Sequence, residues 1–129
     1  MNEKIEKTFV ETFIIKSLQE RLLFELLGKK RNKALTRLSH NIKGIFECKH
    51  MKQIIDKKEL LDMIDEQGFN SNKVYVIGGQ FDGKELPCLE AIQNAFQQSD
   101  AMVLIFSSSF AFIKEESEGG YSEKYILTL

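Results

Sequence analysis

Residues 73–116 decide the fold: they open with KVYVIGG (73–79) and later contain the apolar runs AMVLIF (101–106) and FAFI (110–113). The β-branched and aromatic residues of the first run predict a strand at residues 74–77, which the two glycines end. A helical pattern follows Pro87, and the two later runs, separated by three serines, predict a hairpin of two strands. This region therefore predicts a strand, a crossover helix, a strand, a turn and a further strand.

The two strands around the expected helix do not alternate apolar with polar residues, which indicates that both faces of the sheet are covered. A right-handed crossover would make these strands parallel, and later hairpins, including a last strand at residues 125–129, would add antiparallel strands. We expect a mixed α/β to α+β fold, in which a three- to four-stranded mixed sheet packs with N-terminal helices. The alternative places the helices on one face only and leaves the other face for association.

The 129 residues include one proline and no proline-rich linker, so we expect a single domain over residues 1–129. Residues 1–69 should form a mainly helical layer, and residues 70–129 the β-α-β-β-β sheet portion. Within the helical layer, the segment from Ile5 to Lys16 is ambiguous. Ile5, Phe9 and Phe13 recur at helical spacing, whereas the neighbouring threonines and β-branched residues favour a strand. Helix is the preferred interpretation.

Local signals also suggest where two further helices begin and end. Ser17 and Glu20 match a capping box, which predicts a helix from residue 18 to residue 27, followed by Gly28 as a left-handed end residue. Asp56 can cap another helix, which Gly68 would stop. Residues 46–53 are expected to be a loop, and residues 115–120 an acidic turn.

Charge is distributed unevenly along the chain, although the formal net charge is only −1. Residues 1–58 have a balance of +7 and residues 59–129 a balance of −8, counting Lys and Arg against Asp and Glu. The two halves either neutralise each other within the fold or present a one-signed face to a partner. No apolar run approaches a membrane span and no signal-peptide pattern occurs, so we expect a cytoplasmic protein without a membrane partner.

The segment from Lys29 to Lys43 has the most unusual composition, because it carries six Lys or Arg residues and no acidic residue. Helical spacing places Lys30, Lys33, Arg37 and His40 on one face, and these four are the predicted partner- or polyanion-binding residues. Three interpretations of this face are open: it is exposed to solvent only, it contacts an acidic protein surface, or it contacts nucleic-acid phosphates. The absence of interleaved aromatic residues weighs against single-stranded nucleic acid.

Catalysis would most plausibly involve Cys88, which follows the proline and should lie in the first turn of a helix, where the dipole favours a thiolate. His40 or His50 could then act as the base, and a buried, inert cysteine is the alternative. His40, Cys48 and His50 are too sparse for structural zinc, so no metal and no cofactor are expected. Residues 78–83 (GGQFDG) lack both phosphate-loop patterns and are interpreted as a turn.

These observations favour binding over catalysis. We expect a non-catalytic protein-binding or self-associating module, whose partner is an acidic protein surface or a second copy of the chain. One alternative is a nucleic-acid accessory protein that uses the basic segment, and the other is a cysteine-dependent enzyme that uses Cys88.

Overall fold

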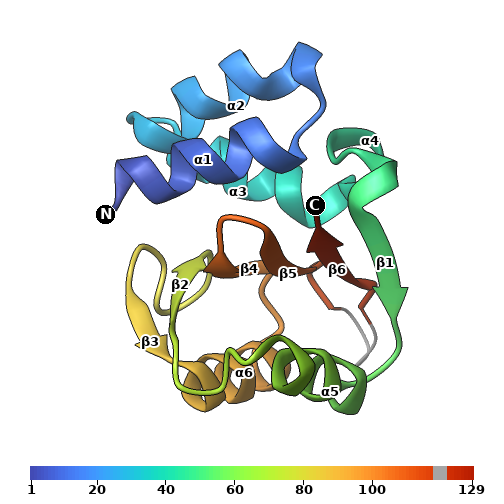
Figure 1. The fold of residues 1–129 in the computed structure, drawn as a ribbon. Coiled ribbons are helices and arrows are strands. Elements are labelled where there is room, and N and C mark those ends of the chain that lie inside the picture. Colours follow the sequence, from blue (N-terminus) through green and yellow to red (C-terminus); the bar gives the residue numbers. More distant parts are fainter. Residues whose placement is uncertain (118–121) are drawn as a thin grey trace.

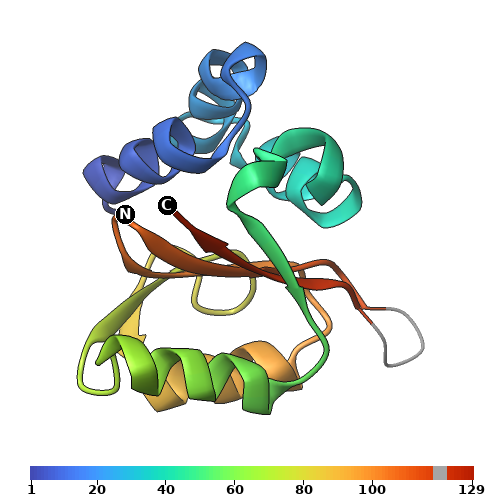
Figure 2. The ribbon, with the colours of Figure 1, turned by 45° about the vertical axis from the view of Figure 1, so that its right-hand side comes forward.

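The computed structural model describes residues 1–117 and 122–129, which form three layers with a sheet between two groups of helices (Figure 1). One face of the sheet is covered by the N-terminal helices and the other by two later helices, as the turned view also shows (Figure 2). Helical coverage of both faces, expected from the non-alternating strands, is therefore confirmed. The first group comprises α1 (Glu3–Phe13), α2 (Lys16–Leu27), α3 (Arg31–His40) and α4 (Ile42–Ile45), and the second comprises α5 (Lys57–Gln67) and α6 (Cys88–Gln97).

The sheet has six strands in the order β1-β6-β5-β4-β2-β3, and every neighbouring pair is antiparallel. Four of the strands are those expected from the sequence, whereas β1 and β3 were not expected, so the three- to four-stranded mixed sheet is corrected to an open antiparallel one. A short 3-10 turn (Cys48–His50) leads into the first strand. The strands are β1 (Met51–Ile54), β2 (Lys73–Ile77), β3 (Glu85–Pro87), β4 (Met102–Ser107), β5 (Phe110–Lys114) and β6 (Lys124–Thr128).

The expected parallel crossover between β2 and β4 is wrong, and β3 is the reason. This short strand turns back along β2, pairing Leu86 with Val74, so the chain has already reversed direction when α6 begins. Because β3 and β4 both run antiparallel to β2, they are parallel to each other and lie on either side of it. The crossover helix therefore connects β3 to β4, with β2 between them.

The expected loop at residues 46–53 is also wrong in its last part, because Met51–Gln53 belong to β1. This edge strand pairs with β6, for example Met51 with Leu127, and its middle residues Lys52 and Gln53 are exposed. A strand of four residues with one fully buried side chain leaves little apolar signal in the sequence. The expected acidic turn at residues 115–120 lies partly outside the described residues.

Tertiary pairing sets the boundary between α1 and α2. Asn2 caps α1, and the helical interpretation of the ambiguous segment is confirmed as far as Phe13. Ile14 and Ile15 lie in neither helix. The capping box at Ser17 is wrong, because α2 begins at Lys16 without a side-chain cap. A bridge between Ile14 and Phe46 holds the link between the helices instead. Gly28 ends α2 with an extended backbone and not a left-handed one.

The boundaries of α5 agree with the sequence signals. The Asp56 side chain accepts a hydrogen bond from the Glu59 N–H at 3.1 Å, and Gly68 ends the helix with a left-handed φ of 75°.

Each face of the sheet carries its own buried apolar cluster. Phe9, Phe13 and Leu26 belong to the cluster on the α1–α4 side, and Leu60, Ile92 and Phe112 belong to the cluster on the α5–α6 side. In the described part of the chain, no helix combines the length and apolar character needed to cross a membrane.

Candidate functional site

The basic segment is divided between several elements and does not form one helix. Lys30 occupies the N-cap position of α3, while Lys33, Arg37 and His40 lie within the helix, of which His40 is the last residue. Lys30, Lys33 and His40 are exposed, and Arg37 is half-buried. Helical spacing therefore places Lys33, Arg37 and His40 on one side of α3, whereas Lys30 precedes the helix.

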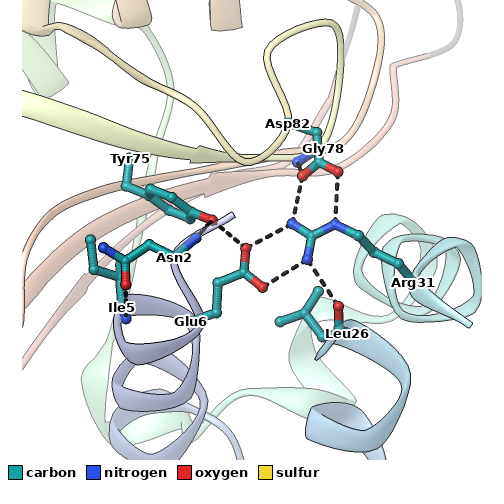
Figure 3. A network of polar contacts seen from close by, with 8 residues as sticks. All are labelled: Asn2, Ile5, Glu6, Leu26, Arg31, Tyr75, Gly78 and Asp82. Atoms are coloured by element: carbon teal, nitrogen blue, oxygen red, sulfur yellow. Dashed lines mark hydrogen bonds and ion pairs between the residues drawn. The ribbon is translucent and has the colours of Figure 1, made fainter. Parts of the chain in front are cut away.

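Arg31, the first residue of α3, has a role that the sequence analysis did not identify. Its guanidinium donates to both carboxylate oxygens of Glu6, at 2.7 and 2.8 Å, and to both oxygens of Asp82, at 2.7 and 2.8 Å (Figure 3). It also donates to the Leu26 carbonyl at 2.9 Å. This paired fork geometry matches the planar guanidinium to two carboxylates at once.

Two further contacts close this network. The Tyr75 hydroxyl donates to Glu6 Oε2 at 2.5 Å and accepts from the Asn2 N–H at 3.0 Å. Asp82 Oδ1 accepts from the Gly78 N–H at 2.8 Å. Helices α1 and α3, strand β2 and the turn after it therefore meet at one set of charges (Figure 3). We call Glu6, Arg31, Tyr75 and Asp82 the Arg31 network.

The environment keeps Arg31, Tyr75 and Asp82 in their ordinary ionisation states. Burial opposes ionisation of Asp82, but hydrogen bonds from Arg31 and Gly78 outweigh it and lower the pKa of the carboxyl. Burial, with the hydrogen bond to Glu6, raises the pKa of Tyr75 to about 12. The hydrogen bond to Asp82 is the main cause that raises the pKa of Arg31, against its burial. With every charge paired, the network favours a structural role that fixes the start of α3.

A groove of about 280 Å³ lies between α2 and α3 and brings two of the predicted residues together. Its apolar lining comes from Leu18, Leu22 and Ile45, and its basic lining from Arg21, Arg37 and His40; we call it the basic groove. A second hollow, of about 350 Å³, shares Arg37 with it and adds Lys33. Lys30 lines neither hollow among those found in the described residues.

Glu25 holds the arginines of the basic groove in place. Arg37 donates to its two carboxylate oxygens at 2.7 and 3.1 Å, and Arg21 Nε lies 3.9 Å from one of them. The hydrogen bond from Arg37 is the main cause that lowers the pKa of Glu25, so this buried carboxylate stays charged. Glu25 was not singled out in the sequence, because it lies in a different helix from Arg37.

The two oppositely charged halves of the chain neutralise each other only in part. Among the described residues, the salt bridge that joins them is Arg31 with Asp82. His40 and Lys43 also lower the pKa of Glu115 electrostatically, although burial and the nearby Glu123 raise it overall. Within the described chain, Lys30 and Lys33 have no acidic partner at ion-pair distance, so the basic face keeps part of its charge for solvent or a partner.

The geometry does not favour a Cys-His pair at Cys88. Cys88 is buried in the α5–α6 cluster, and burial raises the pKa of its thiol. His50 packs edge-on against Phe13, which belongs to the cluster on the opposite face of the sheet. Over residues 1–117 and 122–129, no group of three or more His, Cys, Asp and Glu side chains could hold a metal ion.

No family model matches the sequence, and comparisons with curated proteins and with solved structures found no significant match.

Proposed function

We propose that the protein is a non-catalytic protein-binding module whose basic groove receives an acidic, partly apolar segment of a partner protein. The observation that carries this proposal is the combined lining of the groove, in which three aliphatic side chains and two arginines occur together. Apolar contact area would supply affinity, and the charge of Arg21 would select an acidic segment and speed its association.

The composition of the groove favours a protein over a nucleic acid. Phosphates need cations but gain little from a leucine-lined floor, and no Phe, Tyr or Trp side chain among the described residues lines the groove for base stacking. Arg37 is already engaged by Glu25, which reduces the charge available to a polyanion. A partner with both carboxylates and apolar side chains uses the whole lining.

Binding of model partners tests this proposal directly. Fluorescence anisotropy would compare a labelled peptide of mixed Glu and Leu, an all-Glu peptide, a Lys-Leu peptide, and single- and double-stranded oligonucleotides of similar charge, each at two salt concentrations. We expect the Glu-Leu peptide to bind most tightly and to weaken with salt, because its interaction has both an apolar and an electrostatic part. Tighter binding of an oligonucleotide would instead support the nucleic-acid alternative, and no binding of any probe would refute both.

Matched variants locate the interaction. Arg21→Gln with His40→Gln removes an exposed arginine and an exposed imidazole from the groove, while the control pair Lys52→Gln with Lys57→Gln removes two exposed cations from β1 and α5. Only the first pair should weaken the Glu-Leu peptide. Sedimentation of the free protein tests the remaining possibility, that the chain associates with itself. If the protein is a dimer and the variant with Arg21→Gln and His40→Gln is a monomer, a second copy of the chain occupies the groove.

A further inference from the structure

We propose a second binding site, separate from the basic groove, that takes a small apolar carboxylate between α1 and the sheet. A hollow of about 390 Å³ lies there, bounded by α1, by strands β2, β3 and β4, and by the turn after β4. It shares no lining residue with the basic groove. We call it the α1 groove.

The walls of the α1 groove suit an apolar ligand. Ile5, Phe9 and Phe13 contribute from α1, and Ile105 contributes from β4. The volume lies near the lower end of the range of about 300–1,000 Å³ typical of small-molecule sites. Transfer of an apolar chain from water to such walls is favourable in proportion to the area covered.

The polar lining selects a negative headgroup. Lys4 and Lys73 are exposed and line the groove, and neither has an acidic partner at ion-pair distance within the described chain. Glu85 also lines the groove, which leaves an excess of one positive charge. The hydroxyls of Thr8 and Ser107 add further donors. A carboxylate can accept from ammonium and hydroxyl groups together, whereas an ammonium ligand would meet two like charges.

The Arg31 network makes the α1 groove rigid before any ligand arrives. Tyr75 lines the groove. Its hydroxyl is held by Glu6 and Asn2 (Figure 3). Since Glu6 lies in α1, the same contacts fix the distance between this helix and β2. A preformed site loses less conformational entropy on binding than one that must be ordered by its ligand.

Nuclear magnetic resonance titration with three ligands of equal chain length tests the charge and the place of this site. Octanoate should shift the signals of Ile5, Thr8 and Ile105, 1-octanol should do so more weakly, and octylammonium most weakly. The proposal is overturned if octanoate shifts no signals below its micelle-forming concentration, or if the shifted signals belong to residues outside the α1 groove. It is also overturned if the three ligands bind equally well whatever their charge. N-acetyl-Leu-Leu carries the carboxylate of a peptide end, so tighter binding of this peptide than of octanoate would overturn the free-acid assignment.

Variants separate the headgroup from the walls. Lys4→Gln with Lys73→Gln should weaken octanoate about fivefold and leave 1-octanol unchanged, since two exposed charges are removed. Lys7→Gln with Lys84→Gln removes two exposed cations, from α1 and from the residue before β3, that do not line the groove, and it should change binding of neither ligand. Thr8→Trp should block both ligands by filling the space; if thermal unfolding shows that it does not fold, Thr8→Leu should weaken both. Equal weakening by the two lysine pairs would overturn the proposal.

Discussion

Replacement of Arg31 by methionine should be among the most damaging single changes in the chain. Methionine keeps an unbranched apolar stem but leaves the carboxylates of Glu6 and Asp82 without their cation. The Glu6 side chain is 0% exposed and that of Asp82 is 19% exposed, so water can compensate the second only in part and the first not at all. Removing one partner of a buried ion pair costs about 3–5 kcal/mol, because an uncompensated charge remains.

A loss of this size is a large share of the stability of a small domain, which is typically about 5–15 kcal/mol. Urea unfolding followed by circular dichroism should show the midpoint falling with little change in slope, and Tm should fall by roughly 10–20 °C. The pH dependence gives a second signature. The lowered pKa of Asp82 means that its stabilising contribution is present above the ordinary carboxyl pKa and is lost as the pH falls through the folded-state pKa. Arg31→Met should remove that contribution.

Arg21→Met is the matched control, because Arg21 also faces a buried carboxylate, at 3.9 Å, but its side chain is 65% exposed. This change should cost no more than about 1 kcal/mol. A double-mutant cycle with Glu6→Gln isolates the pair: the double variant should be less destabilised than the sum of the single variants, since the amide no longer needs a cation. If Arg31→Met costs no more than Arg21→Met, the Arg31 network does not stabilise the fold as argued.

Three further changes test other parts of the structure. Asp56→Ala removes the cap of α5 and should lower the free energy of unfolding by about 1 kcal/mol in urea titrations, whereas an unchanged midpoint would mean that the cap is not used. The folded state holds the Tyr75 proton up to a pKa of about 12, against 10.0 ordinarily, so stability should fall as the pH rises through this interval. Tyr75→Phe should flatten this fall, and an equal slope in both proteins would contradict the assignment. A thiol reagent should label exposed Cys48 quickly and buried Cys88 only on unfolding, which mass spectrometry of the labelled peptides would show; equal native rates would place Cys88 at the surface.

Local signals predicted those elements whose formation depends on neighbouring residues. Strands β2, β4, β5 and β6 carry dense apolar runs, and α5 carries both its cap and its left-handed glycine, so each could be recognised in isolation. Strands β1 and β3 exist because a partner strand is beside them, and Pro87 at the end of β3 is tolerated because this strand lies at the edge. Because β3 was not predicted, β4 was predicted to run parallel to β2, whereas it runs antiparallel.

The candidate site also has one part that the sequence predicts and one part that it does not. The basic face of α3 follows from helical periodicity alone, so Lys33, Arg37 and His40 could be predicted to lie together. The role of Arg31 could not, because Glu6 and Asp82 lie 25 and 51 residues away in the chain. No periodicity or motif connects residues at such separations, and only the folded arrangement shows which cation is enclosed and which remains available.

The pairing of β1 with β6 has a consequence for how the chain acquires its structure. Met51 must find Leu127, so this edge of the sheet cannot close until the most distant strand in the chain has been synthesised. Helices α1–α4 meet the same delay, because the surface on which they pack includes residues of β4, β5 and β6. Such long-range contacts slow folding, since chain entropy is lost before the contacts that offset it can form. A nascent N-terminal half would therefore expose the apolar sides of its helices during synthesis, when chaperone binding would protect it from aggregation.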